Sequence, residues 1–183
     1  NRRKDNSLYY EEKTITPLTD RNGRITHFIA TGKDVTGRIQ DRERIDYLSH
    51  HDPLTGLPNR ALMHVRLERM LESADGRGDR IAMLLLDIDR FKVINDSFGH
   101  ALGDSLICEA AERIASCIGE NDLPARIGSD EFCVLLTDAA SIKGLDEIIG
   151  TIAAAFQKPF EFEEYEVYSS VSVGVAVYPD DAD

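Results

Sequence analysis

Two acidic pairs have the residue types and the placement needed for metal-dependent chemistry. Asp87 and Asp89 stand at the end of an almost continuous apolar run, and Asp130 and Glu131 stand between two shorter apolar segments. A carboxylate at the end of an apolar strand is costly unless a partner balances its charge. Magnesium usually takes one or two protein carboxylates together with substrate phosphates. The pairs could therefore hold metal ions over a triphosphate, although Asp-x-Asp alone more often marks a solvated strand end.

A second set of polar residues, between the two acidic pairs, could bind a phosphorylated base. Lys92 could pair with a phosphate group, and Asn95 and Asp104 flank a glycine-containing turn. An aspartate carboxylate can accept the N1 and N2 hydrogens of guanine, and an asparagine amide can complement another edge of the base. Taken singly, each of these residues is only a polar side chain near a turn.

The elements that must position these residues follow from the apolar pattern. The run 81–88 predicts a strand buried on both faces. A short turn and a helix over 101–118 follow, because apolar residues recur there every four positions. A strand–turn–strand over 125–136, a helix from 145 to 156 and one or two strands between 161 and 177 complete the order. This order predicts an α+β fold, a split βαβ arrangement with an antiparallel hairpin inside it.

The first third of the chain reads as a β-hairpin that leads into a charged helix. Strands are predicted over 7–16 and 25–33, with a turn at 20–23. An isolated hairpin is marginally stable, so we expect it to be the end of a domain that starts outside this sequence. The helix over 37–49 has a thin apolar stripe, which fits either a plain linker or a short coiled-coil seam that pairs two chains. A further helix should begin near Pro58, placed close to its first turn.

The net charge and the hydropathy limit the possible partners and location. The chain carries 21 basic and 33 acidic residues, a net charge of −12. An acidic surface repels a nucleic-acid backbone, which argues against a nucleic acid polymer as partner. No apolar run approaches the roughly 20 residues that span a bilayer. We therefore expect no membrane segment here and a cytoplasmic location, which leaves room for a membrane anchor elsewhere in a longer parent protein.

Several motifs occur in order along the chain: DPLTGLPNR over 52–60, LDIDRFKVIND over 86–96, FGHALGD over 98–104, ARIGSDEF over 125–132 and SVGVA over 172–176. Their order is similar to that of GGDEF domains, the diguanylate cyclase family. The resemblance implies a ferredoxin-like palm of the nucleotidyl-cyclase type. It also implies that two GTP molecules, bound head to tail across a homodimer, condense into cyclic di-GMP and pyrophosphate.

The resemblance also implies a role for each matching residue. Asp87, the backbone of Ile88 and Asp130 would ligate Mg²⁺ or Mn²⁺, and Asp130 or Glu131 would help to deprotonate the attacking 3′-hydroxyl. The remaining matches are expected at the substrate: guanine at Asn95 and Asp104, phosphate at Lys92, and further contacts at Phe91, Gly128 and Ser129.

The same reading divides the chain into three parts. Residues 1–36 resemble the C-terminal part of a PAS sensor domain, residues 37–50 form a signalling linker helix, and residues 51–183 form a GGDEF domain that is expected to be C-terminally incomplete. The wording of the motifs also resembles proteins in which an EAL phosphodiesterase follows a GGDEF domain. We therefore expect a cyclase under PAS control, with a downstream EAL domain as a further expectation for the parent chain.

Two departures from the family pattern keep other functions open. Ser129 replaces a signature glycine, which would cost about 1 kcal/mol or more if the turn requires a positive φ. Gly119 replaces the arginine of the inhibitory product site that pairs with the position of Asp122, so we predict no feedback inhibition there. The main alternative is a degenerate GTP-binding domain that regulates an EAL phosphodiesterase. A receptor for cyclic di-GMP and a plain dimerisation module explain fewer residues.

Overall fold

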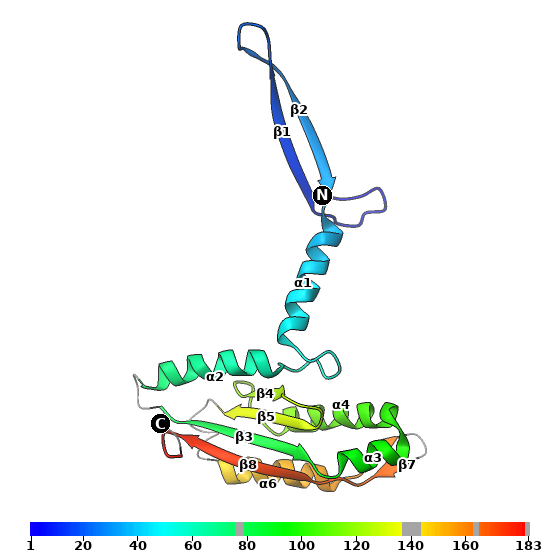
Figure 1. Ribbon diagram of the computed structural model, residues 1–183, viewed down its shortest axis with the longest axis vertical. Helices are drawn as coiled ribbons and strands as arrows, with labels where there is room; N and C mark the ends of the chain where they lie inside the picture. Colours follow the sequence, from blue (N-terminus) through cyan, green and yellow to red (C-terminus); the bar gives the residue numbers. More distant parts are fainter. Residues whose placement is uncertain (76–78, 137–143, 163–164, 182–183) are drawn as a thin grey trace. The chain divides into compact units, whose positions relative to one another are not determined.

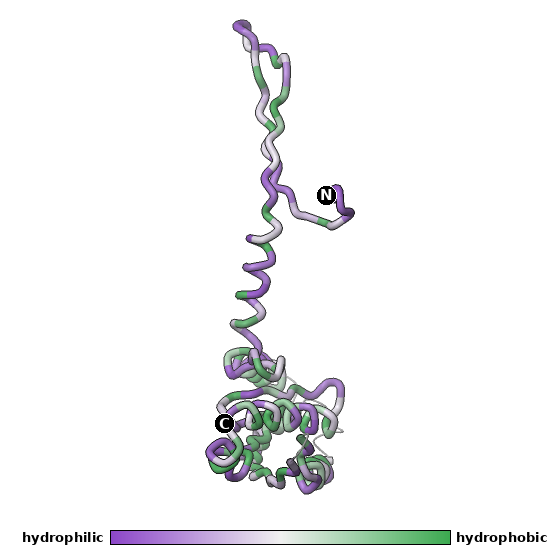
Figure 2. Tube along the Cα trace, turned by 90° about the vertical axis from the view of Figure 1, so that its right-hand side faces the viewer, coloured by the Kyte–Doolittle hydropathy of each residue, from purple (hydrophilic) through white to green (hydrophobic). Residues whose placement is uncertain are grey.

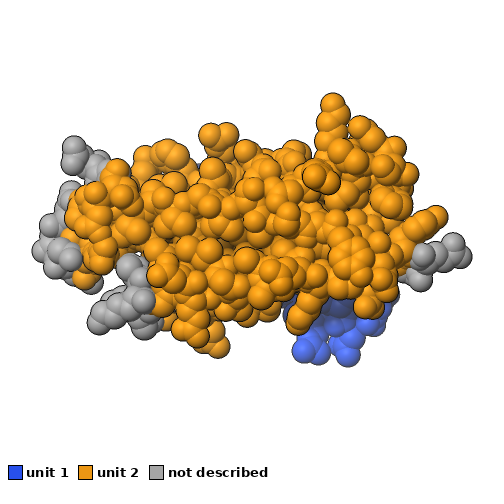
Figure 3. Space-filling model, turned by 90° about the horizontal axis from the view of Figure 1, so that it is seen from below, with its two compact units in different colours: residues 1–48 blue, residues 49–183 orange. Residues whose placement is uncertain are grey.

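The computed structural model describes residues 1–75, 79–136, 144–162 and 165–181. The chain forms two compact units, residues 1–48 and residues 49–183, which are coloured separately in Figure 3. No helix within these ranges is both long and apolar enough to cross a bilayer.

The N-terminal unit contains the predicted β-hairpin (Figure 1). β1 (Glu11–Thr19) pairs antiparallel with β2 (Ile25–Asp34), so the first strand starts later than predicted. At the turn, the Asp20 carboxylate accepts hydrogen bonds from the backbone N–H groups of Asn22 and Arg24, and Gly23 has a φ of 80°. All ten residues of β2 are exposed. The hairpin therefore buries almost none of its apolar surface within the described part of the chain.

A helix cap joins the hairpin to α1 (Thr36–His50). The Asp34 carboxylate accepts hydrogen bonds from the Thr36 hydroxyl and backbone N–H at 2.6 and 3.0 Å. These bonds, together with Arg3, lower the pKa of Asp34 to about 2. Figure 2 shows that α1 is mostly hydrophilic, and its apolar residues Ile45 and Leu48 are exposed. The predicted helix is thus present, while its role as a linker and a coiled-coil seam along it stay predictions.

The C-terminal unit is built on one four-stranded sheet (Figure 1). β4 (Leu123–Arg126), β5 (Glu131–Leu136), β3 (Ile81–Ile88) and β8 (Val171–Tyr178) lie in the order β4-β5-β3-β8, and every neighbouring pair is antiparallel. The long helices α4 (His100–Ser116) and α6 (Leu145–Gln157) connect the strands in the order that a ferredoxin-like fold requires. The predicted α+β class and its internal hairpin are confirmed.

The two faces of β3 have different surroundings. Ala82, Leu84, Leu86 and Ile88 are at most 1% exposed and belong to a core that includes the apolar residues of α4 and α6. On the other face, α2 (Arg60–Asp75) packs against Met83 and its neighbours on β5, but Leu85 is 44% exposed. The prediction of a strand buried on both faces was therefore wrong for the second face. α2 covers only part of it, and Gly174, the partner of Leu85 on β8, has no side chain to add cover.

Four other elements differ from the prediction. α3 (Phe91–Phe98) is a helix where we expected only a turn, and Gly99, with a φ of 85°, separates it from α4. α2 begins at Arg60, because Asn59 caps it through a 3.0 Å hydrogen bond from the Leu62 N–H. Pro58 thus lies outside the helix. β6 (Phe160–Phe162) and β7 (Tyr165–Val167) form a small separate hairpin.

Candidate active site

Three acidic residues stand at neighbouring positions at one end of the central sheet. Asp87 is the penultimate residue of β3, and it stands directly opposite Glu131, the first residue of β5. The Ile88 N–H donates to the Asp130 carbonyl at 3.1 Å, which joins the end of β3 to the loop before β5. Loss of hydration and the negative charges of Asp130, Glu131 and Asp89 raise the pKa of Asp87. This end of the sheet is therefore short of positive charge.

The donors at this end fit a divalent cation that is shared with substrate. Asp87, Asp130 and the backbone of Ile88 offer the oxygen ligands that hard cations prefer. Within the described residues, no three acidic, histidine or cysteine side chains are gathered closely enough to hold a metal ion by themselves. An incomplete ligand set is the usual form of a magnesium site that substrate phosphates complete.

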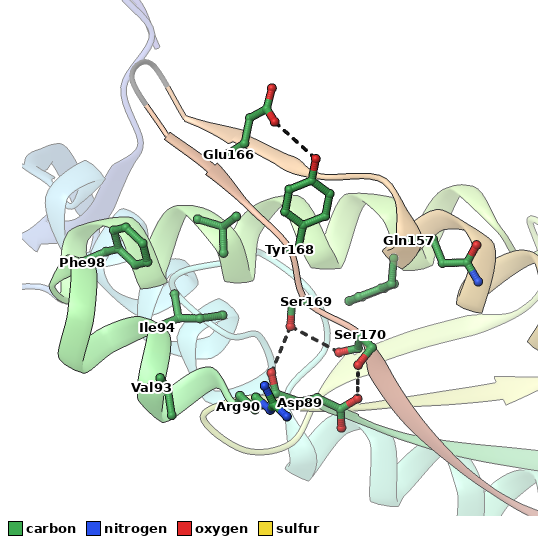
Figure 4. Close-up of a pocket in the computed structure, with 12 residues that line it drawn as sticks. Asp89, Arg90, Val93, Ile94, Phe98, Gln157, Glu166, Tyr168, Ser169 and Ser170 are labelled. Atoms are coloured by element: carbon green, nitrogen blue, oxygen red, sulfur yellow. Dashed lines mark hydrogen bonds between the residues drawn. The ribbon is translucent and has the colours of Figure 1, made fainter.

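Asp89 plays a different part from Asp87, although only one residue separates them. Its carboxylate accepts hydrogen bonds from the hydroxyls of Ser170 and Ser172, and these bonds lower its pKa. Figure 4 shows Asp89 and Ser170 facing one another at the edge of a cavity of about 910 Å³. Asp87, Asp130 and Glu131 do not line this cavity. Asp89 therefore fastens the start of β8 to the end of β3.

The loop of the β4–β5 hairpin accommodates Ser129 without a left-handed backbone. Positive φ values at non-glycine residues of the described chain occur only at Asn6 and Arg90. The strain considered for Ser129 is therefore absent, and its hydroxyl donates a hydrogen bond to the Asp130 carboxylate. Gly128 is more demanding, because a Cβ there would lie 3.1 Å from the Glu131 Cβ and would overlap the Glu131 carboxylate. Gly128 thus leaves space for Glu131.

A half-buried arginine, Arg126, holds this loop through two hydrogen bonds. The Arg126 guanidinium donates to the Ser129 carbonyl at 2.7 Å and to the Asp52 carboxylate at 3.0 Å. Asp52 also accepts from the backbone N–H and the hydroxyl of Thr55. Burial alone would raise the pKa of Asp52, but these hydrogen bonds lower it. The sequence motifs alone give Arg126 and Asp52 no role at the site. The available signal is a charged residue in the short apolar stretch that begins at Ala125.

The base-binding candidates lie on the two helices that follow β3. Asn95 is on α3, and its Oδ1 atom is buried without a hydrogen-bond partner among the described residues. Asp104 is on α4 and lines an open groove of about 580 Å³, which Leu54 also lines. Asp104 is open to a ligand that supplies hydrogen-bond donors, and the Asn95 Oδ1 atom lacks a donor among the described residues. The structure places Lys92 on the exposed surface of α3 and Phe91 in the core, 8% exposed. Contact of Phe91 with substrate stays a prediction.

The sequence of this unit matches a known family model. Residues 49–183 match the model described as "Diguanylate cyclase, GGDEF domain". The chain belongs to this family. The match covers the whole C-terminal unit, so the sheet, the carboxylate cluster and the groove described above are features of a GGDEF domain.

Individual relatives agree with this assignment. The GGDEF chain is 43% identical over 148 residues to the diguanylate cyclase TpbB of Pseudomonas aeruginosa, which covers 80% of this chain and 34% of TpbB. It is 41% identical over 141 residues to MucR of the same organism, named a bifunctional diguanylate cyclase/cyclic di-GMP phosphodiesterase; the match covers 77% of this chain and 20% of MucR. The chain thus spans about a third of TpbB and a fifth of MucR.

A solved structure supports the fold. The GGDEF domain of TpbB superposes with a TM-score of 0.70 at 44% identity, covering 73% of this chain and 78% of that one. The division of the chain into three parts stays a prediction. These parts are a PAS fragment over 1–36, a signalling linker helix over 37–50 and a C-terminally incomplete GGDEF domain over 51–183.

Proposed function

We propose that this GGDEF domain is a diguanylate cyclase that condenses two GTP molecules into cyclic di-GMP and pyrophosphate, with Mg²⁺ or Mn²⁺ and as a homodimer. The observation that carries the proposal is the convergence of Asp87, Asp130 and Glu131 at adjacent strand ends. Asn95 and Asp104 follow the same strand on α3 and α4, with a groove at Asp104 and a buried, unpartnered oxygen at Asn95.

The proposed site has two ends, one that binds the base and one that binds the phosphates. At the base end, the Asp104 carboxylate accepts the N1 and N2 hydrogens of guanine, and the Asn95 amide binds another polar atom of the base. At the phosphate end, Lys92 pairs with phosphate, and Gly128 and Ser129 let the loop backbone approach it. Asp87, Ile88 and Asp130 would hold a divalent cation, which would supply positive charge to offset that of the phosphates. Glu131 or Asp130 accepts the proton of the attacking 3′-hydroxyl.

Residues 1–50 are proposed to control this reaction as the end of a PAS sensor and its linker helix. The hairpin supports this reading because both of its faces carry exposed apolar side chains, among them Ile15, Phe28 and Ile29. Such a hairpin needs further structure to cover it. The site itself is proposed to work in the cytoplasm.

A second candidate function is a GTP-binding domain that regulates an EAL phosphodiesterase without making product. The name of MucR joins both activities in one relative, and Ser129 is a departure from the family signature. The unstrained backbone at Ser129 and the intact carboxylate cluster favour the active cyclase.

The test is product formation from GTP with Mg²⁺, read by chromatography and mass. Asp130→Ala removes a cluster carboxylate, and Asp146→Ala removes an exposed carboxylate on α6 as the matched control. Cyclic di-GMP from the parent and from Asp146→Ala, but not from Asp130→Ala, supports the cyclase. GTP binding by calorimetry without any product would favour the regulatory function instead.

A further inference from the structure

Gly103, in the first turn of α4, lies directly against the side chain of Asn95 on α3. A Cβ built on Gly103 would overlap the Asn95 Oδ1 atom, and it would lie 2.9 Å from the Asn95 Cγ and 3.4 Å from the Phe91 Cζ. The backbone of Gly103 has no positive φ, so an alanine could adopt its conformation. The glycine is needed here for space and not for an unusual backbone.

The group that occupies this space is one half of the proposed base-binding pair. Asn95 Oδ1 is buried and has no hydrogen-bond partner among the described residues. A buried amide oxygen without a partner is unfavourable, and a ligand that donates to it relieves that cost. Asp104, the other half of the pair, is the next residue after Gly103. The absent side chain therefore lets Asn95 lie directly against the backbone of α4, one residue before Asp104.

We propose that Gly103 is a positioning residue for guanine: its missing side chain holds the Asn95 amide beside Asp104 so that both can bind one base. This inference rests on the proposed function of the site and adds a determinant of base affinity that touches no substrate itself. An added methyl group would displace a short side chain and leave the backbone intact. The Asn95 side chain would have to rotate away from Gly103.

A second helical glycine provides a matched control. Gly150 lies within α6, and a Cβ built there meets nothing within 4 Å. Glycine in a helix interior is less favourable than alanine, so alanine at either position strengthens its helix. Only at Gly103 does the new methyl group meet a proposed base-binding side chain.

The experiment compares Gly103→Ala with Gly150→Ala in the whole chain. We expect Gly103→Ala to weaken GDP binding about tenfold in calorimetry, as for one lost hydrogen-bonding group. GDP carries the same base and cannot release pyrophosphate. The KM for GTP should rise by a similar factor while kcat changes less, and Tm should not fall. Gly150→Ala should leave GDP affinity and KM unchanged. Unchanged GDP affinity in a folded Gly103→Ala chain would overturn the inference.

A double-mutant cycle separates positioning from general packing. If Gly103 acts through Asn95, Asn95→Ala weakens GDP binding in the parent but adds little once Gly103→Ala is present. Additive losses would overturn the inference even if Gly103→Ala lowers Tm. A parent chain that binds no guanine nucleotide would overturn the proposed function as well, and that result is seen before any variant is compared.

Discussion

The two faces of strand β3 show how one segment serves both stability and chemistry. Leu84 and Leu86 face the closed side of the sheet and are fully buried, whereas Leu85 and Asp87 face the open side and are exposed. On the open side, Asp87 stands beside Glu131 of β5 and Ser172 of β8. Because strand side chains alternate between faces, successive residues carry different tasks. Substitutions on the two faces should therefore have separable effects.

The largest effect should come from Asp87 on the open face. We expect Asp87→Asn to lower the rate of cyclic di-GMP formation about 10²- to 10³-fold, the usual cost of removing one group that stabilises transition-state charge. Stability should stay equal or rise, because the substitution removes repulsion among Asp87, Asp130 and Glu131. Initial rates and urea unfolding measure the two quantities. A large loss of stability would show that Asp87 belongs with the closed face.

On the closed face, Leu84→Ala should lower the free energy of unfolding of the domain without a specific effect on the site. Leu84 is fully buried, so its truncation should cost about 3 kcal/mol in the free energy of unfolding. Leu85→Ala is the matched control, and it should cost less than about 1 kcal/mol because the side chain is partly in water. Denaturant unfolding of both variants tests the contrast, and equal losses would contradict it.

Arg126 links the open face to the loop around Asp52, so its loss should affect both properties moderately. Arg126→Gln removes the bonds to Ser129 and Asp52. We expect about tenfold slower product formation and a loss of about 1–2 kcal/mol in stability. Arg66→Gln, on the exposed side of α2, is the control and should change neither. A slow but fully stable variant would show that Arg126 acts on the loop alone.

A smaller, pH-dependent effect is expected from Asp52. Its pKa in the folded chain lies below the usual 3.8, so its contribution to stability is present above that value and is lost as the pH falls through the folded pKa. The stability difference between the parent and Asp52→Asn should be full at pH 7 and should shrink below pH 3.8. Urea unfolding at several pH values measures this. A difference that is independent of pH would exclude charge as its origin.

The smallest effect should be that of added product on the rate. Gly119 offers no guanidinium, and the Asp122 carboxylate is turned inward, 7% exposed, where it accepts the Gly119 N–H at 3.0 Å. Cyclic di-GMP added to an active chain should therefore leave the initial rate unchanged. Potent non-competitive inhibition would contradict this, and competitive inhibition would instead indicate binding at the open face.

The sequence predicted the sheet and the acidic cluster because both depend on strong local signals. The apolar run of β3 and the turn before Glu131 define their strands without help from distant residues. α3 was missed because eight residues are too few for a clear helical period, and its form depends on Phe91 and Ile94 being buried against the core. A local sequence pattern cannot show that a short segment folds as a helix because it packs against the core.

Other parts of the site depend on contacts between distant residues. Leu85 is exposed because α2 does not extend over it and because its partner on β8, Gly174, has no side chain. Gly174 lies far from Leu85 along the chain. The bond from Arg126 to Asp52 joins residues 74 positions apart. Phe91 matched the substrate-binding motif, yet it serves the core beneath Gly103. Motif matching identifies which residues matter more readily than it identifies what each one touches.

The alternation along β3 also limits how this protein can vary in length. Inserting or deleting one residue between Leu84 and Asp87 would turn every later side chain to the opposite face. The carboxylate of Asp87 would then point into the core, and a leucine would stand beside Glu131. Point substitutions can retune either face on its own, but a change of one residue in length would exchange the two faces and disable both. Insertions are tolerated only outside this strand, where side chains do not have to alternate between the core and the catalytic site.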